Sequence, residues 1–176
     1  PQIDRAAELQ QKWGTARGQV WEIGRHRLMC GDATSADDHA MLLEEQSVDL
    51  VLTDPPYGVG TEYGVGINFG TTFEDSFEVV KNLVPLFLPH LLRWPVVLLI
   101  PGQTMMWYYP RPTWALSWMI PAGVGRNPWG FTTWYAVLAY GKDPYLVRGL
   151  GGRPDGVTMM ATRDPTIEGH PVIKPL

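Results

Sequence analysis

Cysteine is almost absent from this chain, because Cys30 is the single one among 176 residues. One cysteine cannot form an internal disulfide, so we expect a reducing, cytoplasmic setting and a small buried role for Cys30. Long apolar runs are missing as well, and none approaches the roughly 20 residues of a membrane-spanning helix, so we expect no membrane partner. The chain begins at Pro1 rather than methionine, and we expect a fragment or a trimmed product.

Charge is also scarce, since charged residues make up 18% of the chain and the formal net charge is -4. A negative net charge argues against DNA binding through overall charge, so local basic patches must supply any phosphate contacts. The candidates are Arg25, His26, Arg27, Arg148, Arg153 and Arg163. The alternative is that each of them is an ordinary solvated charge.

Hydrophobic residues, at 45%, suffice for a core, and the length favours one domain over residues 1–176. The first half predicts a leading hairpin within residues 18–30, with strands at 20–23 and 26–29 joined through Gly24. A helix is expected after Ser35, a good N-cap, and should run to about Gln46. A strand over 48–53 follows it.

Apolar residues between 73 and 91 recur at helical spacing, but Pro85 and Pro89 interrupt them, so we expect a break or kink near Val84. Further strands are expected at 96–100, 114–120 and 132–140. Of the eight tryptophans, five fall between 107 and 134, and we expect most of these to lie in the core or on a sheet face.

The most informative segment is Asp54-Pro55-Pro56-Tyr57, which follows the apolar strand at 48–53 and runs into Gly58. Two prolines stiffen the backbone and remove two donors, which leaves bare carbonyls beside a carboxylate and an aromatic ring. Such a segment can accept hydrogen bonds from an exocyclic amine and stack on a flat base. The alternative is a strand end with a proline turn.

This tetrapeptide resembles the catalytic motif of the amino-group DNA methyltransferases, and other blocks extend the resemblance in the family's order. They are residues 18–32, which are similar to a "W-x-L-G-x-H-R-L-x-C-G-D" lead-in, and residues 127–131, 140–145 and 170–176. The resemblance implies a Rossmann-like α/β fold with the mostly parallel sheet of class I methyltransferases, incomplete at the C-terminus. It also implies S-adenosylmethionine as cofactor and DNA as partner, with methyl transfer to adenine N6, or alternatively to cytosine N4. A catalytically inactive DNA-binding module is the other alternative.

The resemblance also implies roles for individual residues. The Asp54 carboxylate and the Pro55 carbonyl would accept the two amine hydrogens, Pro56 would stiffen the motif and Tyr57 would stack on a flipped base. Trp129 is a candidate wall of the base pocket. No metal ligands are implied.

Cofactor-binding candidates are Asp32, Asp54, His170 and Lys174, with Asp32 expected to end a strand beside the catalytic strand. The alternatives are a helix cap for Asp32 and surface positions for His170 and Lys174. The family's main cofactor block, "F-x-G-x-G", is expected after residues 170–175, where this chain stops. We therefore expect an additional domain or a C-terminal segment in the full protein, and the sequence leaves a homodimer open.

Two segments have unusual composition or length. Glycines at 58, 60, 64, 66 and 70 fail the dinucleotide-loop spacing, which disfavours a nicotinamide-dependent oxidoreductase. They predict a mobile loop that closes over the base, or alternatively a disordered surface loop. The insert at 141–169 is short for a recognition region, so we expect either relaxed sequence specificity or recognition by another part of the protein.

Overall fold

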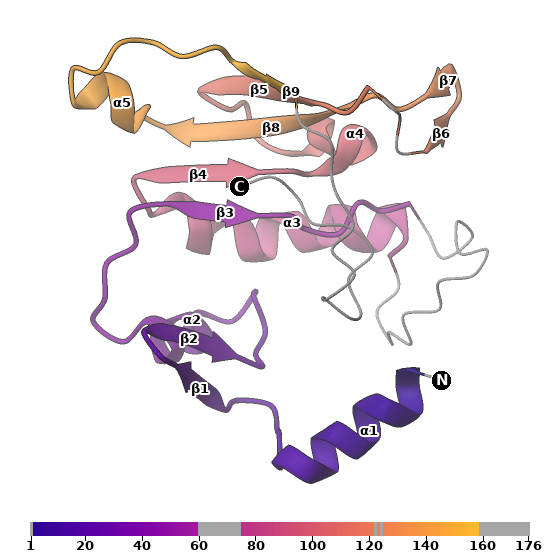
Figure 1. Cartoon of the computed structure of the whole chain (residues 1–176), viewed down its shortest axis with the longest axis vertical. Helices are drawn as coiled ribbons and strands as arrows, with labels where there is room; N and C mark the ends of the chain where they lie inside the picture. The colour runs from indigo at the N-terminus through magenta and orange to yellow at the C-terminus, as the bar shows by residue number, and fades with distance from the viewer. Residues whose placement is uncertain (1, 60–74, 122, 124, 159–176) are drawn as a thin grey trace. The chain divides into compact units, whose positions relative to one another are not determined.

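The computed structural model describes residues 2–59, 75–121, 123 and 125–158, with side chains from Glu8 onward (Figure 1). Contacts divide the chain into two compact units. Unit 1 comprises Pro1–Asp49 and Pro56–Pro95, and unit 2 comprises Leu50–Pro55 and Val96–Leu176. Within the described residues, no helix has the length and hydropathy needed to cross a membrane.

Unit 1 begins with helix α1 (Gln2–Trp13) and the predicted hairpin of β1 (Val20–Ile23) and β2 (His26–Met29). The antiparallel strands pair from Val20 with Met29 to Ile23 with His26, and Gly24 takes a φ of 61° in the tight turn. Helix α2 (Ala36–Leu43) follows, and its N-cap Ser35 accepts a hydrogen bond from the Asp38 backbone. It ends before the expected Gln46, at a left-handed Glu44 with φ of 51°.

Two expectations about this region were wrong. Strand β2 pairs with β1 in a separate two-stranded sheet, so Asp32 does not end a strand beside the catalytic strand. Two antiparallel strands joined by a short turn form their backbone hydrogen bonds with each other. Strand β2 therefore pairs with β1 rather than with a strand of the five-stranded sheet. Cys30 is exposed rather than buried, because it directly follows an edge strand of this small sheet.

Helix α3 (Phe77–Leu92) completes unit 1 and is continuous through Pro85 and Pro89. Of the two alternatives expected near Val84, the break was therefore wrong, and the kink stays a prediction. Both prolines are exposed and lie four residues apart on the same side of the helix. The Lys81 carbonyl that loses its helical partner to Pro85 belongs to an exposed residue, which lets water replace the missing donor. The opposite side holds the buried residues Val80, Val84, Phe87 and Leu88.

Unit 2 is built on a five-stranded sheet in the order β3-β4-β8-β5-β9. Its strands are β3 (Val51–Thr53), β4 (Val96–Leu99), β5 (Trp114–Met119), β8 (Trp134–Gly141) and β9 (Gly156–Thr158). Strand β8 is antiparallel to both neighbours, whereas β3 pairs parallel with β4 and β5 parallel with β9. The α/β expectation holds, but the sheet is mixed rather than mostly parallel in its pairings.

The central strands carry the core of unit 2, where Val97, Leu99 and Leu138 are almost fully buried. Trp118 on β5 is buried as well. Most of the other tryptophans in this part of the chain are exposed, with Trp107 at 78% and Trp114 at 60%. Trp118 in the core and Trp114 and Trp134 on strands of the sheet agree with the expectation that most of the five lie in the core or on a sheet face, although Trp118 alone of the five is buried.

Four strands of the sheet run in one direction and end at the same edge, toward the right of Figure 1. This carboxyl edge receives Asp54 after β3 and the short helices α4 (Gly102–Met105) and η2 (Met106–Tyr108) after β4. A small hairpin of β6 (Arg126–Asn127) and β7 (Gly130–Phe131) precedes β8 there. Within the insert, α5 (Pro144–Val147) and β9 are formed, and β9 extends the main sheet.

Candidate active site

Asp54 stands at the carboxyl end of β3, the position that the sequence predicted for it. Its side chain is exposed, whereas Pro55 directly after it is buried. The Ile100 backbone N–H donates to the Thr53 carbonyl at 3.0 Å, which ties the end of β3 to the end of β4. Ligands of open α/β sheets bind outside the carboxyl ends of the strands, so Asp54 occupies a position suited to a substrate.

The motif is divided between the two units, because Asp54 and Pro55 belong to unit 2 and Pro56 and Tyr57 belong to unit 1. Pro56 and Tyr57 are half-buried. The Gly58 N–H donates to Asp75 Oδ1 at 2.8 Å, with Gly58 at a φ of 66°. This bond joins the residues on either side of the glycine-rich stretch 60–74, which lies outside the described residues.

Trp129 lies in the turn of the β6–β7 hairpin and is 100% exposed. Its backbone N–H donates to Asn127 Oδ1 at 2.8 Å, and Gly130 takes a φ of 135°. An asparagine that bonds the backbone two residues later is a standard way to fix a tight turn. The hairpin was not predicted, although Asn127, Pro128 and Gly130 are turn residues and could have indicated it.

Polar side chains that sequence reasoning missed connect this hairpin to the carboxyl edge. Asn127 Nδ2 donates to Thr132 Oγ1 at 3.2 Å, and that hydroxyl donates to Gln103 Oε1 at 3.3 Å. Gln103 Nε2 in turn donates to the Trp134 carbonyl at 2.6 Å, where β8 begins. Thr132 is buried, so its hydroxyl needs these partners.

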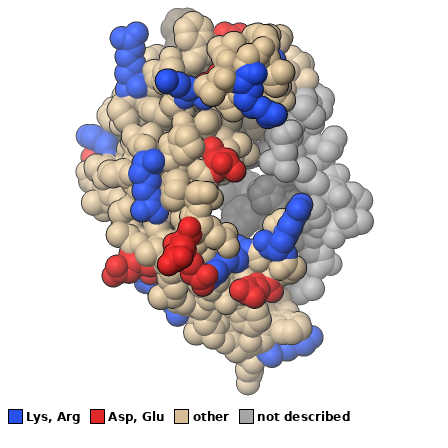
Figure 2. All heavy atoms as spheres, turned by 90° about the vertical axis from the view of Figure 1, so that its left-hand side faces the viewer, with Lys and Arg blue, Asp and Glu red and all other residues tan. Residues whose placement is uncertain are grey.

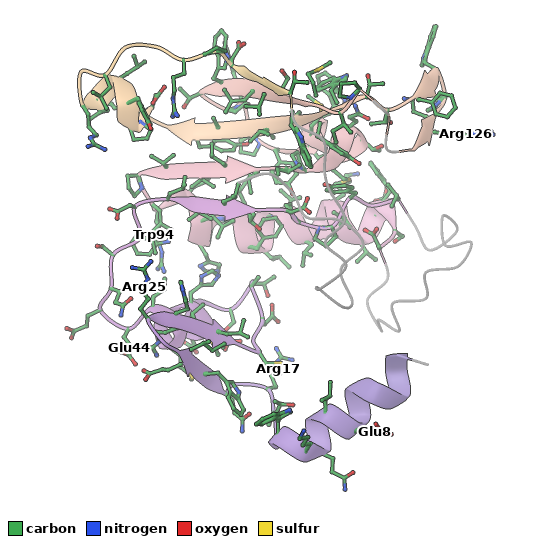
Figure 3. All side chains as sticks on the ribbon, in the orientation of Figure 1. Glu8, Arg17, Arg25, Glu44, Trp94 and Arg126 are labelled. Carbon is green, nitrogen blue, oxygen red and sulfur yellow. The ribbon has the colours of Figure 1, made fainter. Side chains whose placement is uncertain are left out.

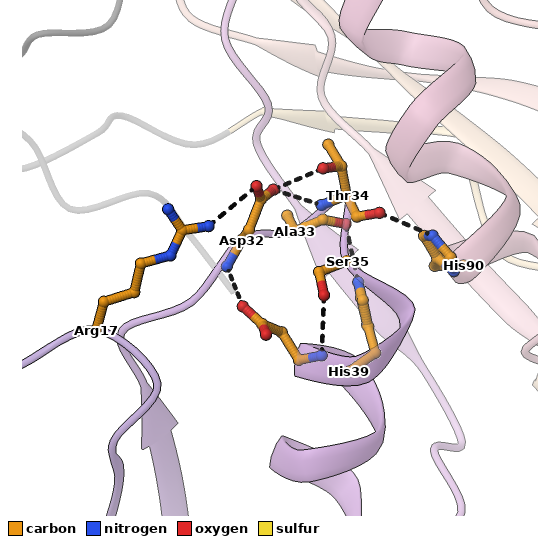
Figure 4. Close-up of polar contacts among 8 residues, drawn as sticks. Arg17, Asp32, Ala33, Thr34, Ser35, His39 and His90 are labelled. Carbon is orange, nitrogen blue, oxygen red and sulfur yellow. Dashed lines mark hydrogen bonds and ion pairs between the residues drawn. The ribbon is translucent and has the colours of Figure 1, made fainter.

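Asp32 organises the turn between β2 and α2 (Figure 4). Its Oδ1 accepts from the Thr34 N–H at 2.9 Å and from the Thr34 hydroxyl at 2.7 Å, and its Oδ2 accepts from Arg17 at 3.2 Å. These bonds favour the carboxylate and hold the pKa of Asp32 below its usual value, with the Thr34 backbone bond as the largest cause. The structure therefore gives Asp32 a role in fixing the turn before α2, whose N-cap is Ser35, and its cofactor role stays a prediction.

Two histidines contact the backbone carbonyls of the same turn. His39 Nε2 lies 2.9 Å from the Ala33 carbonyl, and His90 Nε2 lies 3.1 Å from the Thr34 carbonyl. The two rings stack with centroids 5.1 Å apart. The loop that contains Asp32 is thus fixed to both α2 and α3 within unit 1.

The basic candidates, of which Figure 3 labels Arg25, differ in their surroundings. Arg27 Nη1 forms a 2.8 Å ion pair with Glu44 and lowers the pKa of that carboxyl, so its first role is to join β2 to the end of α2. Arg153 lies 3.4 Å over the Tyr145 ring. Arg25, His26 and Arg148 are exposed. Figure 2 shows Lys and Arg spread over the surface in view, with Asp and Glu in a group below the middle and at separate places above it.

Some predicted site residues fall outside the described part of the chain. They are the two cofactor candidates His170 and Lys174 and the phosphate candidate Arg163. Their roles stay predictions.

No family model matches the chain. Among curated proteins, it is similar to the type II methyltransferase M.HpaI of Haemophilus parainfluenzae, with 29% identity over 142 residues. The match covers 79% of this chain but only 39% of the relative, so the chain spans well under half of that protein's length. The chain is thus a distant homologue of a type II methyltransferase, which supports the methyltransferase resemblance of its sequence.

Proposed function

We propose that this chain is part of an S-adenosylmethionine-dependent DNA methyltransferase that acts on the exocyclic amine of a flipped base, adenine N6 before cytosine N4. The observation that supports it most is Asp54, exposed at the carboxyl end of β3 and followed by a buried proline. The distant similarity to M.HpaI supports the methyltransferase part of this proposal, and the target base rests on the resemblance of the motif. We also propose that the sheet of unit 2 is one part of a Rossmann-like methyltransferase sheet.

The residues of the motif suit the chemistry of an aromatic amine. The lone pair of such an amine is delocalised into the ring, so the nitrogen becomes nucleophilic only as it moves toward tetrahedral geometry. The Asp54 carboxylate and the Pro55 carbonyl would each accept one amine hydrogen, which favours that geometry and stabilises positive charge that grows on nitrogen. Tyr57 would stack on the base once it has left the duplex.

S-adenosylmethionine, when bound, supplies the electrophilic methyl group. Asp54 need not be a strong base, since the amine proton becomes far more acidic once the nitrogen carries positive charge. The carboxylate therefore positions and stabilises the amine, and water can take the proton afterwards.

Asp32 fits the donor set that such a cofactor offers. Its side chain is 41% exposed, and within the described part of the chain its Oδ2 binds the side chain of Arg17 alone, which is itself 73% exposed. Exposed ion pairs of this kind contribute little, so a hydroxyl or ammonium group of a ligand could replace Arg17 without a large cost. His170 and Lys174 are proposed as further contacts on the resemblance alone.

The test is methyl transfer by the full-length protein from labelled S-adenosylmethionine to duplex DNA, followed by identification of the modified nucleoside. N6-methyladenine would support the whole proposal, and N4-methylcytosine would correct the target base. DNA binding without methyl transfer would instead favour the inactive binding module.

A further inference from the structure

The β6–β7 hairpin presents three exposed side chains that can contact a base or a phosphate. Trp129 in its turn is fully exposed, and Phe131 is 69% exposed. Arg126, which Figure 3 labels, pairs directly across from Phe131 in the antiparallel register, so these two side chains share one face of the hairpin. Single exposed aromatics are common, but two aromatics and an arginine on so short an element indicate a contact surface.

Several hydrogen bonds hold the hairpin in place in spite of its exposure. Asn127 fixes the turn through the Trp129 backbone, and the Thr132 N–H donates to the Gly125 carbonyl at 2.8 Å. The bonds from Asn127 through Thr132 to Gln103 then anchor the hairpin beside the ends of β4 and β8. An aromatic ring on a fixed support loses little conformational entropy when it binds, which strengthens stacking.

The electrostatic surroundings favour an anionic partner, such as a nucleic acid, over a basic or neutral one. Residues 96–142 contain no Asp or Glu but include Arg111, Arg126 and Lys142, although the whole chain carries a net charge of -4. Among the described residues of unit 2, the acids other than Asp54 are Asp143 and Asp155, and both are used locally. Asp143 caps α5, and Asp155 accepts from the Trp114 indole at 3.0 Å.

We propose that the β6–β7 hairpin inserts Trp129 into the base stack of duplex DNA beside the target base, where it fills the space that the extruded base leaves. This inference rests on the proposed function. Apolar and aromatic side chains that enter a base stack compensate for lost base stacking, and Arg126 on the same hairpin can contact the adjoining phosphate. A fully exposed ring in a protruding turn suits insertion better than a place in the wall of a base pocket.

Gln103 and Thr132 are then positioning residues for the hairpin. They touch neither base nor cofactor in this account, but they fix the direction in which the hairpin projects from the carboxyl edge. Thr132→Val keeps the shape of the side chain and removes both of its hydrogen bonds, so it tests the anchoring directly.

The experiment uses the full-length protein and a duplex with 2-aminopurine at the methylated position, whose fluorescence rises when that base leaves the stack. Wild type is expected to give a clear rise. Trp129→Ala should lose most of it and bind roughly 5-fold to 150-fold more weakly, the range expected for one lost stacking contact. Trp129→Phe should retain most of the rise, and Thr132→Val should give an intermediate value.

Controls separate loss of insertion from misfolding, from a general loss of surface tryptophan and from loss of the chemical step. Trp107→Ala removes another exposed tryptophan of unit 2 and should leave the signal unchanged. A mismatch at the target position weakens the pair to be opened and should restore the signal of Trp129→Ala, which also shows that this variant is folded. Asp54→Ala should lose methyl transfer but keep the fluorescence rise, so failure of the chemistry and failure of insertion are distinguishable.

Unchanged fluorescence in Trp129→Ala would overturn the proposal. Brighter fluorescence would overturn it as well, because it is the result expected if Trp129 stacked on the extruded base and quenched it. A change in oligomeric state with DNA binding intact would assign the hairpin to a protein interface instead.

Discussion

Asp32 and Ser35 act together at the start of α2. Asp32 fixes the turn before the helix through the Thr34 N–H, and Ser35 satisfies one of the N–H groups of the first helical turn that have no helical partner. Ser35 accepts from the Asp38 N–H at 3.2 Å, while the Asp38 carboxylate accepts from the Asp32 N–H at 2.6 Å. Gly31 leaves room beside them, because a Cβ there would lie 2.7 Å from an Asp38 side-chain oxygen and would force that carboxylate to shift. The Gly31-Asp32 pair of the lead-in motif thus has a structural reason that is independent of any cofactor.

The lowered pKa of Asp32 predicts acid sensitivity of unit 1. A carboxylate whose pKa is depressed by folding stabilises the protein above its unfolded pKa, and that stability is lost as the pH falls through the folded value. Asp32→Asn should therefore be less stable than wild type at neutral pH and less affected by a shift from about pH 5 to about pH 2. Urea unfolding at a series of pH values measures this, with Asp49→Asn as a control for loss of one negative charge. Parallel pH profiles for wild type and Asp32→Asn would contradict it.

Ser35→Ala removes the N-cap bond of α2 and should lower the free energy of unfolding by about 1 kcal/mol. Ser35→Asp keeps an acceptor at the cap and should stay close to wild type. Denaturant unfolding of both variants measures the difference, and equal losses in the two would show that the cap bond is not the cause.

At the scale of elements, helix α3 combines a well-buried side with two helix-breaking residues on its exposed side. Pro85 cannot donate to the Lys81 carbonyl, so the helix exists because burial of residues such as Val80 and Val84 outweighs that loss. The sequence pattern identified the buried side correctly. It could not show that both prolines face water, where their cost is smallest.

Pro85→Ala restores the missing N–H and should raise the free energy of unfolding by about 2 kcal/mol, after allowance for the greater freedom of the unfolded chain. Leu86→Ala, at an exposed neighbouring position, should change it by less than about 0.5 kcal/mol. Thermal and urea unfolding provide the measurement. A neutral or destabilising Pro85→Ala would mean that the proline shapes the helix in a way the N–H argument omits.

Local sequence signals predicted where the helices and strands of this chain lie better than they predicted which strands pair with one another. The β1–β2 hairpin was predicted with its observed bounds because Gly24 and the flanking strands specify it within a few residues. The position of Asp54 after a strand was likewise readable from the apolar run before it. Which strand lies beside β3 depends on pairing between distant segments, and the expectation for Asp32 failed for that reason.

The Trp129 hairpin shows the same limit within the candidate site. Its turn residues are visible in the sequence, but the bonds from Asn127 to Gln103 join positions more than twenty residues apart, so only the fold brings them together. Exposure of most tryptophans in this region was also not predicted. Tryptophan side chains are mostly buried on average, so the sequence alone predicts burial. A tryptophan that contacts a ligand is more exposed than that average.

At the scale of the whole molecule, the acidic average conceals an uneven distribution of charge. Unit 2 carries more basic than acidic residues, although the chain as a whole is negative. Asp54 thus places a carboxylate at the edge of a unit whose net charge suits DNA binding. A negative group there weakens phosphate binding, so its presence indicates another function. That function, in our account, is to accept a hydrogen of the amine that is methylated.

Methyl transfer by Asp54→Ala in the full-length protein tests this account most directly, with Asp49→Ala as the matched control from the segment before β3. The account predicts that Asp54→Ala lowers kcat roughly 100-fold or more, while DNA binding and Asp49→Ala activity stay near wild type. Methyl transfer by Asp54→Ala at the wild-type rate would contradict it.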